Sequence, residues 1–357
     1  MSSLFKDMLT SEQTLFKNEI ALDFDYLPKL IPYREQEQKN IAASIKPLFD
    51  KRNGKNLFIF GQPGIGKTAA VRHVLNDLEE ETEEVIPIYL NCWQKNSTFK
   101  ILLEICDILG YKLTHNKRSD ELYAVIKKLL NKKAVVFAFD EADKLEDFDF
   151  LYTLLEEIYR KSIILITNYH DFVDNLDSRV KSRLLPEMME FRQYDLNETK
   201  GILKNRREYA FFPNVWEQDA FDFVVNKTAD LKDIRSGLHL MRESANIAED
   251  KSLKKIKLEF AEEACKKIDE FTIKKSTDLA SDENMILDII KDNSNAKIGD
   301  IFKIYQQKGG SLVYKSFQRK IDKLCKNKFI SVEKTEGGKG GNTSIIKYAQ
   351  TKKLTEF

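Results

Sequence analysis

The sequence predicts an α/β fold in which a five-stranded parallel sheet domain is followed by an all-helical subdomain and a C-terminal winged helix-turn-helix. Three observations lead to this class. Five short apolar runs alternate with helical patterns, the pattern then turns wholly helical, and three short helices with two strand-like runs follow near the end. Apolar strands that alternate with helices are typical of a parallel sheet covered on both faces. We therefore expect three domains, at residues 1–195, 196–280 and 281–357.

The five expected strands are short and rich in β-branched and aromatic residues, as buried strands are. From residue 197 to 271, apolar residues recur at three- and four-residue spacing, which predicts amphipathic helices. The polar stretch that follows lacks this periodicity, so the second boundary is expected near residue 280. The strands are expected at residues 56–60, 85–92, 134–140, 162–168 and 187–193.

The last helical pattern, just before the two strand-like runs, has two unlike faces. Phe317, Ile321 and Leu324 form an apolar stripe, and basic residues occupy the opposite face. Residues 281–357 carry fifteen Lys and Arg against nine Asp and Glu, a net charge of +6 in a chain whose total is +1. A basic unit on an acidic remainder indicates an anionic partner for one end of the molecule, with a lysine-rich solvated face as the alternative.

Composition excludes several classes of protein. Of the 357 residues, 42% are hydrophobic and 32% charged, which is typical of a soluble globular chain. No apolar run approaches the roughly 18–20 residues that span a bilayer, and the first residues lack the apolar core of a secretory signal. The four cysteines are scattered without a C-x-x-C pair, which argues against a zinc site or a disulfide framework. We expect a cytoplasmic protein that contacts no membrane.

The segment GQPGIGKT at residues 61–68 matches the P-loop pattern G-x-x-x-x-G-K-[ST]. It follows a predicted strand and opens a helical pattern, which is the context that a P-loop needs. Its glycines let backbone N–H groups curl around phosphate oxygens beside a helix N-terminus. Lys67 is expected to reach the β- and γ-phosphates of ATP, and the Thr68 hydroxyl is expected to hold Mg²⁺.

A second motif, VVFAFDEAD at residues 135–143, places carboxylates directly after an apolar strand. Asp140 is expected to bind the metal through water, and Glu141 to orient the attacking water. A surface acidic loop is the alternative, and the buried strand that precedes the carboxylates argues against it. The letters D-E-A-D also suggest a helicase, but no second helicase-type sheet domain follows.

Further polar candidates come later in the chain. Asn168 ends a predicted strand, where its amide can either sense the γ-phosphate or serve as a turn asparagine. Arg179 or Arg183 is a candidate arginine finger for a neighbouring subunit, with ordinary surface arginines as the alternative. Arg235 begins a later helix, from which it can close on the nucleotide.

Taken in order, these segments resemble the archaeal replication initiators related to the eukaryotic origin recognition complex and its cell-division-cycle loader partner, within the AAA+ ATPases. The resemblance covers nearly the whole chain and implies an AAA+ P-loop sheet domain, a helical lid and a winged-helix DNA-binding domain. It rests on IPYREQE, YLNC, FDEADKL, ITNYHDFVDNLDSRVKSRL, FRQYDLNETKGILKNRREYAF, DIRSGLHLMRESANIAE and the winged helix.

By position, the resemblance implies ATP contacts from the P-loop and from two later residues. Tyr194 would lie near the adenine, and Arg206 would come from the first lid helix. Asn168 becomes sensor one and Arg235 sensor two. An insertion at about residues 94–119 is implied to contact DNA. The implied P-loop contacts are Gly64, Ile65, Gly66, Lys67, Thr68 and Ala69, and the basic candidates of the insertion are Lys112, Lys117 and Arg118.

Three positions depart from the family pattern. Lys232 stands where a glycine is usual, so the lid turn is expected to differ. Tyr33 replaces a common histidine in the N-terminal linker. Arg183 adds a second arginine after Arg179, which is more like eukaryotic subunits and clamp loaders. This second arginine favours ATP shared between subunits, and a monomer acting on DNA is the alternative.

A winged helix places its third helix in the major groove and its wing against an adjacent groove or the backbone. Arg319 is the candidate for a guanine edge, because a guanidinium can bind one bidentately. The wing tip GGKGG brings Lys339 and backbone without Cβ atoms to a phosphate, with a mobile loop that contacts nothing as the alternative. The contacts expected from the third helix are Lys315, Ser316, Arg319, Lys320 and Lys323.

Together these observations predict an ATP-regulated initiator that recognises replication origins, hydrolyses ATP slowly as a switch and helps to load the replicative helicase. The expected cofactors are ATP and Mg²⁺. The expected partner is double-stranded origin DNA in the nucleoid, bound by a monomer or a nucleotide-dependent assembly. Three alternatives stay open: a helicase or clamp-loader ATPase, a DNA-binding regulator or defence ATPase of a mobile element, and a structural protein that holds ATP without turnover. A clamp loader would normally end in a helical collar, and the Asp140–Glu141 pair counts against the structural role.

Overall fold

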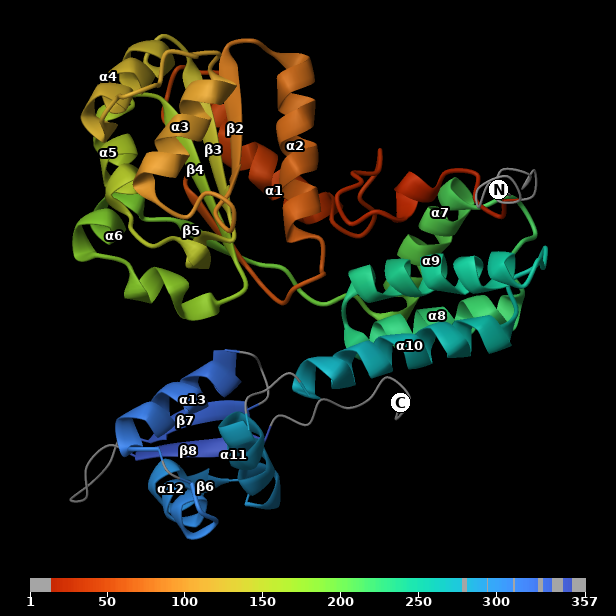
Figure 1. Ribbon diagram of the computed structural model, residues 1–357. Coiled ribbons are helices and arrows are strands. Elements are labelled where there is room, and N and C mark those ends of the chain that lie inside the picture. The colour runs from red at the N-terminus through yellow and green to blue at the C-terminus, as the bar shows by residue number, and fades with distance from the viewer. Residues whose placement is uncertain are drawn as a thin grey trace, which may run out of the picture. The chain divides into compact units, whose positions relative to one another are not determined.

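A computed structural model describes residues 14–277, 281–293, 295–310, 312–326, 330–335 and 343–348 (Figure 1). The chain divides into two compact units, Met1–Leu258 and Glu259–Phe357. The domain boundary predicted near residue 280 falls on residues 278–280, which lie outside the described ranges, so the three predicted domains stay a prediction. Among the described residues, no helix combines the length and the apolar character that a bilayer crossing needs.

The first unit is built on a five-stranded parallel sheet with the strand order β2-β3-β4-β1-β5. The predicted α/β sheet is confirmed, although three strands end earlier than predicted. β1 is four residues long and pairs with both β4 and β5, and the carbonyl of its last residue, Phe60, accepts from the Phe191 N–H at 2.9 Å, so residues 192–193 lie beyond the paired residues. The strands are β1 (Leu57–Phe60), β2 (Val85–Asn91), β3 (Ala134–Asp140), β4 (Lys161–Thr167) and β5 (Glu187–Glu190).

Helices cover both faces of this sheet, and β3 is buried at every position along its length. One face packs against α1 and α2, and the other packs against α3 to α6. Polar residues at the carboxyl ends of the strands therefore gather at one edge of the sheet, where open α/β sheets bind ligands. The helices are α1 (Glu35–Ile45), α2 (Lys67–Glu81), α3 (Thr98–Ile108), α4 (Ser119–Leu130), α5 (Asp149–Glu157) and α6 (Ser178–Leu184).

Three further helices form the helical subdomain of the first unit. Asp195 and Glu198 start the first of them with a capping box, in which each carboxylate accepts a hydrogen bond from the other residue's backbone N–H, at 2.8 and 3.0 Å. Lys232, in the turn between the second and third, has a φ of 56°. This lysine therefore adopts the left-handed conformation that glycine reaches most easily. The helices are α7 (Leu196–Ala210), α8 (Gln218–Leu231) and α9 (Ile234–Asp250).

Residues 14–32, which we call the N-terminal strap, contact the helical subdomain before the chain enters α1. Phe16 forms an antiparallel bridge with Phe211, and the two rings stack with centroids 5.1 Å apart. Arg206 of α7 donates a hydrogen bond to the carbonyl of Tyr26 at 3.2 Å. The strap thus links the helical subdomain to the sheet. From residue 14 onward, the first unit also contains four short 3₁₀ helices: η1 (Glu19–Leu22) in the strap, η2 (Lys46–Leu48), η3 (Ala142–Lys144) and η4 (His170–Asn175).

The second unit has the helix and strand order of a winged helix. An antiparallel sheet with the order β6-β8-β7 packs with three helices around a core that includes Ile286, Ile301, Phe317 and Leu324. The three predicted helices and the hairpin are confirmed, whereas the two-residue β6 was not predicted, because two residues carry no periodicity. The elements are α10 (Leu258–Thr277), which begins at the division between the units, α11 (Ser281–Asp292), β6 (Ala296–Lys297), α12 (Ile298–Gln307), α13 (Tyr314–Lys326), β7 (Ile330–Thr335) and β8 (Thr343–Tyr348).

Candidate nucleotide site and DNA-contact residues

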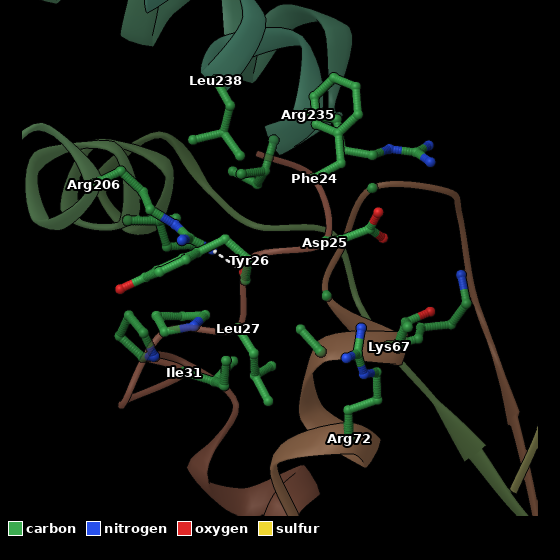
Figure 2. A pocket seen from close by; sticks show the side chains of 18 of the residues that line it. Phe24, Asp25, Tyr26, Leu27, Ile31, Lys67, Arg72, Arg206, Arg235 and Leu238 are labelled. Carbon is green, nitrogen blue, oxygen red and sulfur yellow. Dashed lines mark hydrogen bonds between the residues drawn. The ribbon is translucent and has the colours of Figure 1, made fainter. Parts of the chain in front are cut away.

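A cavity of about 690 Å³ lies in the first unit, where the strap, the P-loop, the carboxyl ends of the strands and the helical subdomain meet (Figure 2). Figure 2 shows apolar strap residues such as Leu27 and Ile31 on one wall, and Arg206, Arg235 and Leu238 of the helical subdomain on another. Most of the predicted nucleotide residues line this one cavity. They are Gly64, Gly66, Lys67, Thr68, Ala69, Asp140, Glu141, Asn168, Tyr194, Arg206 and Arg235.

The P-loop needs its glycines at two positions. Gly64 and Gly66 have φ values of 74° and 87°, which L side chains rarely adopt. A Cβ atom on Gly64 would lie 1.9 Å from an oxygen of Asp233, and one on Gly66 would lie 2.7 Å from the hydroxyl of Tyr194. The helical subdomain also touches this loop directly, because the backbone N–H of Ile234 donates to the Gly64 carbonyl at 3.3 Å.

Lys67 is buried at the start of α2, and three acceptors surround its ammonium group. Its Nζ donates to the carbonyls of Gly61 and Gln62 at 2.8 and 2.7 Å, and to Oδ1 of Asn168 at 2.9 Å. Burial lowers the pKa of Lys67 to about 8. A phosphate favours the charged form of this lysine, so the position suits an anionic ligand.

Asp140 is held at the end of β3 by donors on both of its oxygens. Oδ2 accepts hydrogen bonds from the hydroxyl of Thr68 at 2.6 Å and from that of Tyr89 at 2.8 Å, and Oδ1 accepts one from the backbone N–H of Glu141 at 2.9 Å. Hydroxyl and carboxylate oxygens are the ligands that Mg²⁺ prefers. Since Mg²⁺ usually takes one or two protein ligands together with phosphates and waters, Thr68 and Asp140 fit its requirements.

Glu141 lies beside this carboxylate in an unusual backbone conformation. Its φ is 55°, a left-handed value that costs a non-glycine residue roughly 1 kcal/mol. Burial, and then the charge of Asp140, raise the pKa of the Glu141 carboxyl. A carboxylate with a raised pKa, carried by a strained backbone at a cavity wall, is the arrangement expected of a group that holds a reacting water.

Arg235 is paired within its own helix terminus. Its Nε and Nη2 donate to the two oxygens of Asp233 at 3.1 and 3.0 Å, and Asp233 also caps α9 through the Arg235 backbone N–H. The guanidinium lines the cavity, as the sensor-two prediction requires. The same Asp233 contacts Gly64, so the arginine, its partner and the P-loop form one connected group.

Two predicted nucleotide residues have contacts that sequence reasoning did not foresee. Arg206 lines the cavity, but its guanidinium donates to the carbonyls of Ala21 and Tyr26 and lies 5.0 Å from the Tyr26 ring centroid. It therefore fixes the strap. Ile65 is buried behind the P-loop and turns its carbonyl toward Arg34. Their ATP contacts stay predictions.

Arg34 is a site residue that the sequence did not identify, although it lies in the quoted segment IPYREQE. It is completely buried. Its guanidinium donates to the carbonyls of Ile65 and Arg192, pairs with Glu37 at 2.9 Å and stacks 4.0 Å from the Tyr194 ring centroid. Arg34 thus joins the P-loop to the segment that leads into the helical subdomain. The available signal was a single arginine before a helix, and nothing in the local pattern distinguishes it from a surface residue.

The two arginine-finger candidates lie outside the cavity, on α6. Arg179 pairs with Asp177 at 3.0 Å, and Arg183 pairs with Glu156. Both guanidinium groups lie near the ring of Tyr152. Neither reaches the nucleotide site of its own chain, so a contribution to a neighbouring subunit stays a prediction.

The basic candidates of the insertion lie on the surface of the first unit around α3 and α4. Lys112 pairs with Asp107 at 2.5 Å, and Lys117 pairs with Glu121 at 3.5 Å. The backbone N–H of Arg118 donates to Glu121 at 2.9 Å, where α4 begins. All of these contacts are local, so they neither require nor oppose a DNA partner.

On α13, the DNA-contact candidates divide into two kinds. Lys315 and Arg319 are exposed. Ser316 is half-buried, and Lys320 pairs at 2.7 Å with Glu283, whose side chain is completely buried. Lys320 therefore neutralises a buried charge inside the winged helix. The side chain of Lys323 and the wing tip with Lys339 lie outside the described residues.

Comparisons with known proteins agree with this architecture. Residues 50–175 match the family model of an AAA domain, and residues 200–266 match that of the Cdc6 AAA+ ATPase-type lid domain. ORC1-type DNA replication protein 1 of Sulfurisphaera tokodaii is 34% identical over 279 residues, which cover 74% of this chain and 70% of that protein. ORC1-type DNA replication protein 2 of Methanosarcina mazei is 28% identical over 355 residues, which cover 96% and 95% of the two chains.

Solved structures give the same result. The Aeropyrum pernix ORC1 protein in complex with DNA matches with a TM-score of 0.73 and 25% identity over 96% of this chain and 95% of that one. Cdc6p from Pyrobaculum aerophilum shares the fold, with a TM-score of 0.65 and 18% identity over 96% of each chain. The predicted resemblance is confirmed. On the fold, the cavity and these matches together, the chain belongs to the family of ORC1-type DNA replication proteins of the AAA+ ATPase class.

Proposed function

We propose that this protein binds replication-origin DNA under the control of ATP and starts DNA replication from it. The observation that carries the proposal is the cavity in which P-loop, strand-end carboxylates and helical lid meet, in a chain that also contains a winged helix with exposed basic residues. The names of the relatives support the replication role, and the DNA complex of the Aeropyrum pernix protein supports a DNA partner.

The cavity residues have distinct tasks in this proposal. P-loop N–H groups and Lys67 bind the phosphates of ATP. Thr68 and Asp140 hold Mg²⁺, which neutralises phosphate charge when it is bound. Glu141 orients the attacking water, and Asn168, which already accepts from Lys67, lies next to the γ-phosphate. Arg235 reaches the phosphates from the lid. ATP hydrolysis is slow and acts as a switch.

The switch acts through contacts between the helical subdomain, which serves as the lid, and the P-loop. Asp233 and Ile234 touch Gly64, and Arg34 ties Ile65 to Arg192 at the entrance to the lid. A phosphate that competes with Asp233 for Arg235 changes these contacts, so ATP and ADP favour different lid positions. The lid leads to the winged helix along the chain, and in this way the nucleotide sets the DNA-binding state.

The DNA contacts come from α13 and the wing of the second unit, with the insertion around Lys112, Lys117 and Arg118 as a further contact. Exposed Lys315 and Arg319 suit phosphate and base contacts in a major groove. The protein acts in the cytoplasm at the nucleoid, as a monomer or as an assembly that forms on DNA with ATP. Through it the replicative helicase is recruited to the origin.

Genome-wide occupancy of the protein tests this function most broadly. The proposal expects binding sites concentrated where replication starts, and footprints at those sites that differ between ATP and ADP. Occupancy confined to the promoter of its own gene would instead identify a regulator of a mobile element. A salt titration of the best site counts the phosphate contacts. The logarithm of the binding constant falls linearly with the logarithm of the salt concentration, and the slope is proportional to the number of these contacts.

A further inference from the structure

We propose that Tyr89 is a positioning residue for Mg²⁺–ATP, because its hydroxyl fixes the orientation of the Asp140 carboxylate. The inference rests on the proposed nucleotide function of the cavity. It assigns to β2 a part in metal binding that neither the P-loop pattern nor the acidic motif contains.

Strand register explains how Tyr89 reaches Asp140. β2 and β3 pair in parallel, with Asn91 opposite Asp140 and Tyr89 opposite Ala138. Side chains two positions apart on a strand share a face, so Tyr89 is the diagonal neighbour of Asp140 on the face covered by α2. The tyrosine ring is long enough to span this diagonal, and its hydroxyl lies 2.8 Å from Oδ2 of Asp140.

The hydroxyl of Tyr89 completes the set of donors around the carboxylate. Thr68 Oγ1 donates to the same Oδ2 from the P-loop helix, and the Glu141 backbone N–H donates to Oδ1. Thr68 is itself expected to bind the metal, and the Glu141 bond is local to the strand end. Tyr89 is therefore the described donor that holds Asp140 from a neighbouring strand, where the rigid sheet fixes its position.

The ring of Tyr89 is also held in place. Arg72 of α2 lies with its guanidinium carbon 5.6 Å from the ring centroid, and both residues line the cavity. Residues that orient metal-binding carboxylates typically change metal affinity by roughly 10–100-fold when they are removed. If Tyr89 only filled space, a phenylalanine would serve equally well, and this difference defines the test.

The test compares Mg²⁺ dependence of nucleotide binding in the wild-type protein and in Tyr89→Phe. A fluorescent ATP analogue is titrated in EDTA and then across a range of Mg²⁺ concentrations. In EDTA we expect the two proteins to bind the ATP analogue with equal affinity, because the P-loop is unchanged. With Mg²⁺, we expect Tyr89→Phe to need a roughly 10-fold higher Mg²⁺ concentration for half-maximal enhancement of nucleotide binding. This readout measures binding and does not depend on turnover.

Tyr305→Phe is the matched control. It removes a tyrosine-to-aspartate hydrogen bond of the same length, 2.8 Å to Asp282, from the second unit, and it should leave the Mg²⁺ dependence at the wild-type value. An unchanged Mg²⁺ midpoint in Tyr89→Phe overturns the role of Tyr89 and leaves the proposed function intact. A wild-type protein that binds no nucleotide with or without Mg²⁺ overturns both.

Discussion

At the scale of single residues, the cavity brings together charged groups that act on one another, since the charge of Asp140 raises the pKa of the Glu141 carboxyl. Lys67 is buried with a pKa of about 8, Asp140 has donors on both oxygens, and Glu141 has a left-handed backbone and a raised pKa. Each of these features suits a polyanion and a divalent cation. Removing one group should therefore affect binding or turnover in a way that identifies its task.

The buried ammonium of Lys67 predicts a pH effect on ATP affinity. In the free protein it loses its proton above about pH 8, whereas bound phosphate favours the charged form and raises the pKa. Affinity should be fully present below pH 8 and should fall as the pH rises beyond it, by at most about tenfold per pH unit. Lys67→Arg stays charged throughout, so its affinity, measured by the same titration, should not show this fall. A wild-type affinity that stays constant up to pH 10 would contradict the assignment.

Glu141→Gln should separate binding from turnover. The amide keeps the size of the side chain but cannot accept a proton or orient water as a carboxylate does, so hydrolysis should fall by roughly 100-fold or more while ATP affinity stays within about threefold. The matched control is Glu146→Gln, whose side chain pairs with Asn96 and does not line the cavity. Phosphate release at the wild-type rate by Glu141→Gln would refute its role.

At the scale of elements, the contacts between the sheet, the P-loop and the helical subdomain decide whether a bound nucleotide changes the conformation of the chain outside the cavity. Arg34 is the clearest case, since one buried guanidinium serves the P-loop carbonyl of Ile65 and the Arg192 carbonyl before α7. A buried cation with this many acceptors cannot be removed without leaving unpaired polar groups.

Arg34→Met should lower the free energy of unfolding by roughly 3 kcal/mol and weaken ATP binding, because Glu37 and two carbonyls lose their donor. Chemical denaturation with and without ATP measures both effects. Arg52→Met is the control, because Arg52 pairs with Asp50 on an exposed surface and should not change the stability measurably. Equal stability of the two variants would mean that Arg34 is not a structural link.

The winged helix gives a second prediction at this scale. Arg319→Ala should weaken binding to a specific site by about 1–3 kcal/mol and leave non-specific duplex binding less affected, because a base contact carries sequence information and a phosphate contact does not. Lys303→Ala, on the exposed surface of α12, is the control for a lost positive charge. Parallel titrations with a footprinted site and a scrambled duplex distinguish a base contact from a phosphate contact. Equal losses on both duplexes would make Arg319 a phosphate contact.

The elements also show which parts of the fold and of the site can be predicted from the sequence. Apolar runs identified all five strands of the first sheet, and the P-loop pattern placed Lys67 and Thr68 in the cavity. The ends of β2, β4 and β5 were predicted too late, because the sequence does not show where pairing with the neighbouring strand stops. The strap and Arg34 were missed as site components, because their contacts join residues far apart in the sequence, such as Arg34 and Arg192. Tyr89 was missed because its task depends on strand register, which the sequence alone does not reveal.

At the scale of the whole molecule, the central claim is that the nucleotide cavity controls the winged helix. The chain matches the models of an AAA domain and of a Cdc6-type lid, and the similar ORC1 protein of Aeropyrum pernix was solved in complex with DNA. Contacts from Gly64 to Asp233 and from Ile65 through Arg34 to Arg192 provide its first steps. They predict that nucleotide identity, and not DNA alone, sets the affinity for a specific site.

The most direct test is the affinity of the full chain for its best genomic site, measured at one salt concentration with ATP, with ADP and without nucleotide. We predict that ATP and ADP give affinities that differ by at least about fivefold, the lower end of ordinary allosteric coupling. Lys67→Ala should bind the same duplex with one affinity in all three conditions. Identical wild-type affinities in all three conditions would contradict the account, because the cavity would then bind its nucleotide without any effect on DNA.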